Sequence, residues 1–311
     1  MMRAAPLVVA VVLGVLALIA CGGSAPEPPP AETAEAPAIQ VQTVEPGDGE
    51  IQSHLATKVL EVGTQRVAFL LNTRKALIKA PQVHISVAPA DGSVRPTEIT
   101  ADYNAWPYGV RGSYAAPVEF PTPGDYRLTV MPVGGEVSGE AVIDVSVWAD
   151  SPIPSVGEAA PASETKTLDN TAEIVDLTTS YEPDAELYRV SVAEAVASGK
   201  PSVVVFATPA FCTSPTCGPQ VDTVSELRAE HPDAANYVHV ELYDNPSEIQ
   251  GDLSRAELVA AADEWGFTQI PGWTNESWVF VLDGEGIVRQ RFEGFATLTE
   301  LEAALAEAGG L

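Results

Sequence analysis

The hydrophobic pattern changes its period about halfway along the chain, and this change limits the architecture more than any other feature. Residues 51–149 alternate apolar and polar side chains over short runs, of which the clearest are 66–71, 82–87, 126–130 and 141–145. Such alternation predicts strands with one buried face. Turn signals such as Asp91-Gly92 separate the runs, and no helical period of useful length occurs. We therefore expect an all-β sandwich over residues 51–149.

Residues 150–170 contain several prolines and no sustained period, which predicts a connector. In residues 171–311 strands alternate with helices. The run Val203-Val204-Val205-Phe206 predicts a strand buried on both faces of a mixed or parallel sheet. A second strand is expected at 237–243. Two more, at 277–282 and 287–292, flank the turn signal Asp283-Gly284-Glu285-Gly286.

Three helices are expected between and after these strands. One should begin near Pro219, with Val221, Val224 and Leu227 on one side. The pattern Ser254-Arg-Ala-Glu257 predicts a capping box that opens a second helix, and Gly266 should end it. Thr299 to Glu302 predicts the cap of the last helix. The order β-α-β-α-β-β-α predicts an α/β domain with a central mixed sheet flanked by helices.

The first 50 residues are predicted to be a leader followed by a spacer. Residues 1–20 carry an uncharged apolar run after Arg3 that ends at Cys21, which is typical of an export signal. The ending Leu18-Ile19-Ala20-Cys21 resembles the bacterial lipobox, and this resemblance implies a lipid on Cys21 and an extracytoplasmic protein anchored to a bacterial membrane. A retained transmembrane helix is the alternative. The Pro- and Glu-rich residues 21–50 predict an extended linker without a core.

Composition limits the chemistry. The chain has 43 acidic and 16 basic residues, a formal net charge of -27, which argues against binding to nucleic acid. With three cysteines and four histidines, a four-thiolate metal cluster is excluded. We expect no cofactor and no metal.

The chemistry-bearing residues are Cys212 and Cys217, which lie between the buried strand and the helix near Pro219. The N-terminus of a helix favours a thiolate over a thiol. A helix that begins at Gly218, with Pro219 in its first position, leaves residues 213–216 as a turn that can bring the sulfurs together. A purely structural disulfide is the alternative, although so short a loop constrains the unfolded chain little.

With this placement, residues 155–311 resemble the thioredoxin-like superfamily, in particular TlpA-like thiol–disulfide proteins and peroxiredoxins. The resemblance includes an entry segment from about residue 155 and the strand around Val204. It implies disulfide exchange with protein thiols or an electron-donor protein, through Cys212 and Cys217, with Thr208, Phe211, Gly218 and Pro219 around them. Four residues separate the cysteines, where thioredoxins have two. The segment 112–127 is similar to immunoglobulin-like domains of the FixH and YtkA type.

The pattern Cys-Thr-x-x-x-Cys also resembles peroxiredoxin Q-like enzymes, in which the first cysteine attacks peroxide and the second resolves the product. Two departures place peroxidase activity second. Thr208 lies four residues before Cys212, where the family has three, and Ser277 stands where the family has an arginine. Family order favours Cys212 as the nucleophile, whereas the helix N-terminus favours Cys217, so the assignment stays open.

The superfamily also implies a cis-proline that faces the cysteines and helps to dock substrate. Pro271 and Ser277 are the candidates for this place, and an ordinary loop proline is the alternative for Pro271. Two further functional readings remain open: copper handling of the Sco type, which would need His231 or His239, and a binding or scaffolding lipoprotein with a fixed disulfide.

Overall fold

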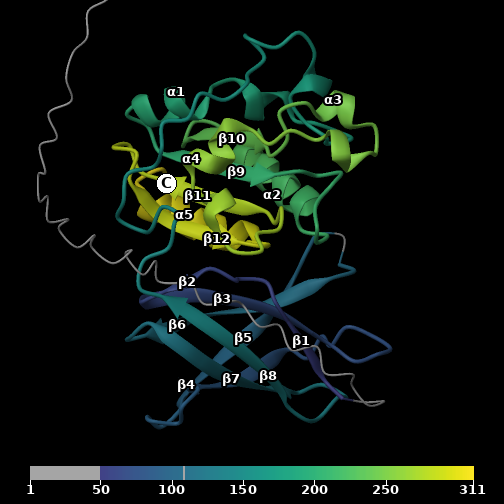
Figure 1. Ribbon diagram of the computed structural model, residues 1–311, viewed down its shortest axis with the longest axis vertical. Helices are drawn as coiled ribbons and strands as arrows, with labels where there is room; N and C mark the ends of the chain where they lie inside the picture. Colours follow the sequence, from purple (N-terminus) through teal and green to yellow (C-terminus); the bar gives the residue numbers. More distant parts are fainter. Residues whose placement is uncertain (1–49, 108) are drawn as a thin grey trace, which may run out of the picture. The chain divides into compact units, whose positions relative to one another are not determined.

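The computed structural model describes residues 50–107 and 109–311 (Figure 1). The predicted signal segment, Cys21 and the linker up to residue 49 lie outside the described residues. Among the residues that are described, no helix combines the length and apolar character needed to cross a membrane.

The first eight strands form one continuous sheet, which we call the curled sheet. Its strands run in the order β1-β3-β6-β5-β4-β7-β8-β2. All four strands predicted in this region are present, within β3, β4, β7 and β8, so the sheet-rich character of residues 51–149 is confirmed. The bounds are β1 Gln52–Leu55, β2 Leu60–Glu61, β3 Gly63–Asn72, β4 Gln82–Pro89, β5 Thr97–Ala105, β6 Gly112–Phe120, β7 Gly124–Val133 and β8 Ala141–Trp148.

Strand β5 makes the sheet continuous, where the expectation was two facing sheets. Its residues 97–102 pair with β4, whereas residues 103–105 pair with β6. The inward side chains of both halves then pack into one hydrophobic core, which includes Phe69, Ile85 and Val130, all with no exposed surface. The strands therefore alternate between buried and exposed side chains as predicted, but the buried faces belong to one curled sheet.

The second sheet, which we call the mixed sheet, has the order β10-β9-β11-β12 (Figure 1). Strands β9 and β10 are parallel, and β11 is antiparallel to both β9 and β12. The predicted mixed sheet is thus confirmed, as is the hairpin closed by Asp283 and Gly286. The bounds are β9 Ser202–Ala207, β10 Asn236–Glu241, β11 Trp278–Leu282 and β12 Val288–Glu293.

Helices cover both faces of the mixed sheet. Residues of α2 and α5 join one buried cluster with Val203 and Val205, while α1 and α4 join the other with Val204 and Phe206. The continuous apolar run of β9 follows from this double cover. The helices are α1 Val192–Ala197, α2 Cys217–Glu230, α3 Pro246–Ile249, α4 Ala260–Glu264 and α5 Leu298–Glu307, with 3₁₀ turns η1 Ile174–Asp176, η2 Ala185–Tyr188, η3 Leu253–Arg255 and η4 Phe267–Gln269.

Two predicted caps were wrong. The box expected at Ser254 and Glu257 does not form, because the Glu257 N–H donates to Asn245 and holds the chain extended until Val259, which precedes α4. The last helix is capped two residues earlier than predicted, by Thr297 and Glu300, which form a complete capping box. Both Thr297 and Thr299 have a glutamate three residues later, so the local pattern alone did not choose between them.

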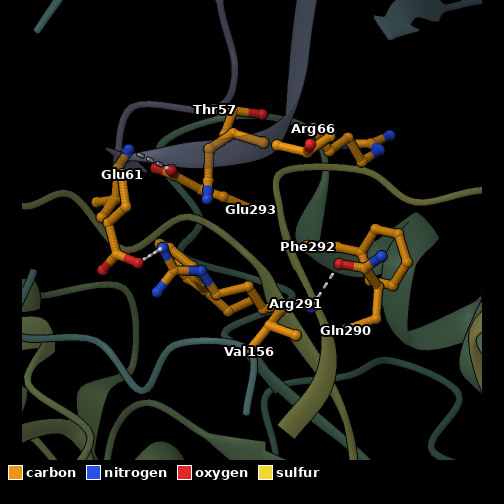
Figure 2. Close-up of a pocket in the computed structure, with 12 residues that line it drawn as sticks. Thr57, Glu61, Arg66, Val156, Gln290, Arg291, Phe292 and Glu293 are labelled. Carbon is orange, nitrogen blue, oxygen red and sulfur yellow. Dashed lines mark hydrogen bonds and ion pairs between the residues drawn. The ribbon is translucent and has the colours of Figure 1, made fainter. Parts of the chain in front are cut away.

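The curled sheet and the mixed sheet meet through buried charges (Figure 2). Arg291 of β12 pairs with Glu61 of β2 at 3.1 Å, and both side chains are less than a tenth exposed. Glu293, at the end of β12, accepts hydrogen bonds from the backbone N–H groups of Lys58 and Val59 at 2.6 and 2.8 Å. Val59, Glu61, Arg291 and Glu293 border a small cavity of about 40 Å³. The interface therefore depends on ionisable groups that are shielded from water.

Candidate functional site

The loop from Thr208 to Thr216 carries the first cysteine of the candidate site. It begins directly after β9, whose residues have no more than 1% exposure, and ends at α2. Thr208 is buried, and its carbonyl accepts a hydrogen bond from the Phe211 N–H in a tight turn. The loop thus leaves a rigid strand and presents Cys212 one residue after the turn.

Cys212 and Cys217 are joined in a disulfide with a Cα–Cα distance of 5.9 Å, inside the usual range for such bonds. Cys212 is half-buried, whereas Cys217 has no exposed surface and packs in the core beneath α2. Cys217 is the first residue of α2, so the helix begins one residue before the predicted start at Gly218, and Pro219 is its third residue instead of its first. The two cysteines therefore differ in exposure: Cys212 is partly exposed and Cys217 is not.

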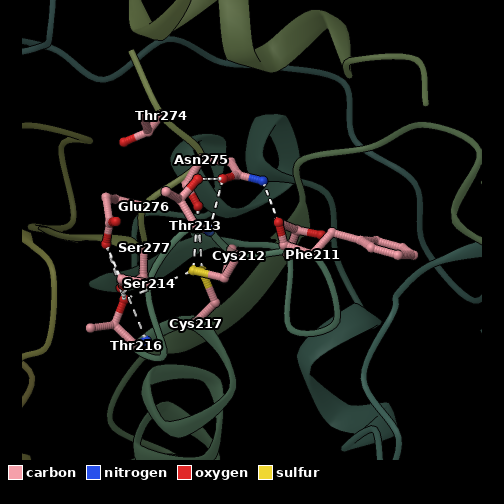
Figure 3. The surroundings of a disulfide bond; sticks show 12 residues. Phe211, Cys212, Thr213, Ser214, Thr216, Cys217, Thr274, Asn275, Glu276 and Ser277 are labelled. Carbon is pink, nitrogen blue, oxygen red and sulfur yellow. Dashed lines mark hydrogen bonds between the residues drawn. A yellow bond between two sulfur atoms is a disulfide. The ribbon is translucent and has the colours of Figure 1, made fainter. Parts of the chain in front are cut away.

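A second loop, between η4 and β11, covers the disulfide (Figure 3). The backbone carbonyl oxygen of Asn275 lies 3.4 Å from Cys212 Sγ and 3.5 Å from Cys217 Sγ. In the reduced protein this oxygen would accept a hydrogen bond from a thiol. Asn275 is the residue that touches both sulfur atoms, and the sequence analysis did not select it.

Hydroxyl groups and one carboxylate complete the surroundings of the pair. Ser214 Oγ donates to Glu276 Oε2 at 2.6 Å, and Thr216 Oγ1 donates to the same oxygen at 3.3 Å. Ser277 Oγ lies 3.1 Å from Thr216 Oγ1 and donates to the Gly294 carbonyl at 2.9 Å. Around the two cysteines, the hydrogen-bonding side chains are thus neutral hydroxyls, an amide and the buried Glu276.

The two predicted docking residues have different places. Pro271 is exposed and belongs to a turn in which the Trp273 N–H donates to the Ile270 carbonyl. No cis peptide bond occurs within residues 50–107 and 109–311, so of the two alternatives left open for Pro271 the structure has the ordinary loop proline. Ser277 is buried next to the cysteine loop, where it supports Thr216.

Of the predicted surroundings, Phe211 is half-buried and packs edge-on against Tyr243, with ring centroids 6.2 Å apart. Thr208 Oγ1 lies 3.5 Å from Thr179 Oγ1. The Thr179 hydroxyl accepts a hydrogen bond from the Ala210 N–H at 3.1 Å and donates one to Glu241 Oε2 at 2.7 Å. Thr179 therefore connects the cysteine loop to a buried acid at the end of β10.

Glu241 and His239 lie on β10, which neighbours β9. Burial raises the pKa of the Glu241 carboxyl to about 7, although hydrogen bonds from Thr179 and Thr208 oppose the shift. Burial lowers the pKa of His239 to about 4, so its imidazole is neutral at pH 7. The Tyr188 hydroxyl lies 2.6 Å from His239 Nδ1. His239, Glu241 and Tyr243 line a cavity of about 100 Å³.

One group of side chains in the described residues could hold a metal ion. It consists of Glu230, His231 and Glu302, whose ligand atoms lie within 4.8 Å of one another. His231 follows the last residue of α2 and Cys217 is the first, and a 14-residue helix is about 20 Å long. His239 has both ring nitrogens next to protein partners, Tyr188 and the Ala207 carbonyl. The structure thus brings neither histidine to the cysteines as a copper site would require.

Sequence reasoning missed Asn275, Glu276 and Glu241. Asn275 and Glu276 lie in the loop before β11, which the superfamily resemblance marked as important without indicating which residue would contact the sulfurs. Glu241 offered a local signal, because a carboxylate inside the apolar run 237–243 is unusual for a strand with a continuous buried face.

Comparison with known proteins adds little. No family model matches the chain, and no curated protein matches it. A crystal structure of an engineered protein aligns with 32% of this chain and 20% of its own length, at 13% identity and a TM-score of 0.21. A likeness so weak carries no argument about fold or function.

Proposed function

We propose that this chain is a thiol–disulfide oxidoreductase of the thioredoxin-like class that acts through Cys212 and Cys217. The observation that carries the proposal is the unequal access of the two sulfurs at the start of α2. Cys212 is partly exposed, which would let another thiol approach it, while Cys217 is fully buried at the N-terminus of α2. The strand order β10-β9-β11-β12, with the cysteine pair between β9 and α2, supports the thioredoxin-like assignment.

The unequal access gives each cysteine a role. A thiolate of a reduced protein substrate attacks Cys212 Sγ, so a bond forms between the two sulfurs while the Cys212–Cys217 bond breaks. The electron pair leaves on Cys217 Sγ, where the orphan N–H groups and dipole of α2 stabilise a thiolate. A second substrate thiolate then attacks the substrate sulfur of the mixed disulfide and releases Cys212. The substrate dithiol loses two electrons, and the cysteine pair gains them and takes up two protons.

The same steps in reverse reduce a substrate disulfide. A dithiol or disulfide protein must return the pair to its starting state in either direction. Peroxidase activity is the weaker proposal, because a peroxidatic thiolate needs an electrostatic partner. Among the residues that the structure describes, the polar side chains that hydrogen-bond to the cysteine loop are hydroxyls, an amide and the carboxylates of Glu241 and Glu276, with Ser277 in the place expected for an arginine.

We also propose that the protein works outside the cytoplasm, anchored through lipidated Cys21, with an immunoglobulin-like domain formed by the curled sheet. The lipobox-like ending of residues 18–21 and the Pro- and Glu-rich spacer support this arrangement. Export also suits the disulfide, since such bonds persist in oxidising compartments. Metabolic labelling with a palmitate analogue, with Cys21→Ser as the control, tests the anchor.

Trapping of mixed disulfides tests the central assignment. With the Cys217→Ser variant, a protein probe that keeps a single cysteine, activated as a mixed disulfide with thionitrobenzoate, should accumulate as a mixed disulfide on Cys212, with release of thionitrobenzoate. Under the same conditions Cys212→Ser should trap at least tenfold less, because Cys217 is buried. Equal trapping would overturn the assignment of roles. A wild-type disulfide that exchanges with no dithiol probe would support the structural-disulfide reading instead.

A further inference from the structure

Asn275 occupies the middle of the loop that covers the disulfide, and its side chain contacts both residues that flank Cys212. On one side, Asn275 Nδ2 donates to the Phe211 carbonyl oxygen at 2.6 Å. On the other side, Asn275 Oδ1 accepts from the Thr213 N–H at 3.0 Å and from the Thr213 hydroxyl. One amide group thus holds the backbone before and after the half-buried Cys212 (Figure 3).

The amide is itself fixed from the opposite side. Asn275 Nδ2 also donates to the Tyr243 hydroxyl at 3.1 Å, and Tyr243 packs against Phe211. The next residue, Glu276, takes up hydrogen bonds from Ser214 and Thr216, so the rest of the cysteine loop is tied to the same segment. These contacts involve no sulfur atom, and they therefore remain available when the disulfide is reduced.

We propose that Asn275 is a positioning residue that sets the reduction potential of the Cys212–Cys217 pair by holding Cys212 beside Cys217 in the dithiol state. Every disulfide has a reduction potential, so the effect of Asn275 can be measured whether or not the protein is an oxidoreductase. Only its role in catalysis rests on the proposed function. If the loop stays in place after reduction, the two thiols keep a high effective concentration toward each other. A high effective concentration favours the disulfide and makes the potential more negative.

The proposal predicts that a change at Asn275 shifts the equilibrium between the disulfide and the dithiol, in addition to any effect on folding stability. Replacement of Asn275 by Ala removes the contacts to Phe211, Thr213 and Tyr243, so the reduced loop gains freedom and Cys212 moves away from Cys217 more often. We expect the equilibrium constant for reduction to rise about tenfold, which corresponds to a potential about 30 mV less negative. The Asn275→Asp variant keeps the acceptor for Thr213 and loses both donors, so its shift should lie between those of wild type and Asn275→Ala.

A matched control is present in the same domain. Asn245 also bridges two loop segments, through hydrogen bonds from its Nδ2 to the Arg255 carbonyl at 2.9 Å and from the Glu257 N–H to its Oδ1 at 3.0 Å. Asn245→Ala should lower the stability of the fold to a similar extent, but it should change the redox equilibrium less than twofold, because its loop does not contact the cysteines.

The experiment is a redox titration of the full chain against dithiothreitol, with alkylation of free thiols, accompanied by urea unfolding of each variant. A tenfold shift in Asn275→Ala with less than a twofold shift in Asn245→Ala supports the proposal. An unchanged constant in Asn275→Ala, or equal shifts in both variants, overturns it. Failure of the proposed function looks different: the wild-type protein would then titrate with dithiothreitol and yet exchange with no protein dithiol.

Discussion

The cysteine loop and the interface between the two sheets are both built from polar contacts, but they differ in charge and in access to water. The loop around the half-buried Cys212 is held mainly by neutral hydroxyls and an amide, together with the carboxylate of Glu276. The interface is held by the buried ion pair of Arg291 with Glu61 and by the buried carboxyl group of Glu293. Neutral contacts at a partly open site can be broken and remade at low cost, whereas a buried charge that loses its partner is expensive. The first region is suited to change during function, and the second is suited to remain fixed.

The largest expected effect concerns the ion pair at the interface. Arg291→Met leaves Glu61 buried without its cation, and we expect a loss of about 3 to 5 kcal/mol in the free energy of unfolding. Urea denaturation measures this loss. The exposed pair of Arg127 with Asp144 supplies the control, and Arg127→Met should change stability little. The redox equilibrium of the cysteines should stay within twofold of wild type, and a larger change would mean that the two regions are not independent.

The second prediction concerns how the stability of the interface between the two sheets depends on pH. Burial raises the pKa of Glu293 to about 7, from an ordinary value of 4.5, and nearby Glu276 adds to the shift against hydrogen bonds from Val59 and Lys58. The folded state therefore keeps a proton that the unfolded state has already lost between pH 4.5 and 7. The stabilisation from this group is complete below pH 4.5 and is lost as the pH rises through 7.

The expected decrease in unfolding free energy from Glu293 between pH 5 and pH 8 is about 3 kcal/mol. Glu241, whose pKa is also raised to about 7 by burial, adds a decrease of the same sign. Glu293→Gln should remove one of the two contributions, so the variant loses stability with rising pH less steeply than wild type. Urea unfolding at several pH values measures both slopes. Exposed Glu285→Gln should keep the wild-type slope, and an identical slope for Glu293→Gln would contradict the assignment.

The smallest of the three effects is expected from the disulfide. Its closed loop is short, and the chain-entropy model gives such a bond about 2 kcal/mol of stabilisation. Reduction by dithiothreitol should therefore lower the urea midpoint by less than Arg291→Met does and should leave the fold intact. Far-ultraviolet circular dichroism of the reduced protein checks this. Unfolding on reduction would show that the bond is structural, and it would remove the distinction between an adaptable loop and a fixed interface.

The elements of the mixed sheet were predictable because their signals are local. The run from Val203 to Phe206 has no exposed surface in β9, as a strand covered on both faces requires. The start of α2 was located to within one residue from Gly218 and Pro219, since both residue types have strong positional preferences at helix ends. The curled sheet was predicted less completely, because strands such as β5 expose many residues and show weak alternation.

The surroundings of the cysteines could not be predicted in the same way. Asn275 meets Thr213 across 62 residues of sequence, and Lys58 meets Glu293 across 235. No local pattern encodes such contacts, which appear only when the strands have brought the loops together. In this loop the superfamily resemblance pointed to Pro271, which is exposed, whereas the contact to the sulfurs comes from the Asn275 carbonyl oxygen, a group that any residue type provides.

The hydrogen bonds from residues 58 and 59 to Glu293 have a practical consequence for the design of shorter fragments. A fragment that starts after the curled sheet would lack the two backbone amides that donate to this carboxylate, and Arg291 would lose Glu61. Fragment boundaries chosen from the connector alone would therefore separate a donor from its acceptor. Expression of the cysteine-bearing half should be planned with residues 56–61 supplied in trans, or with Glu293 replaced.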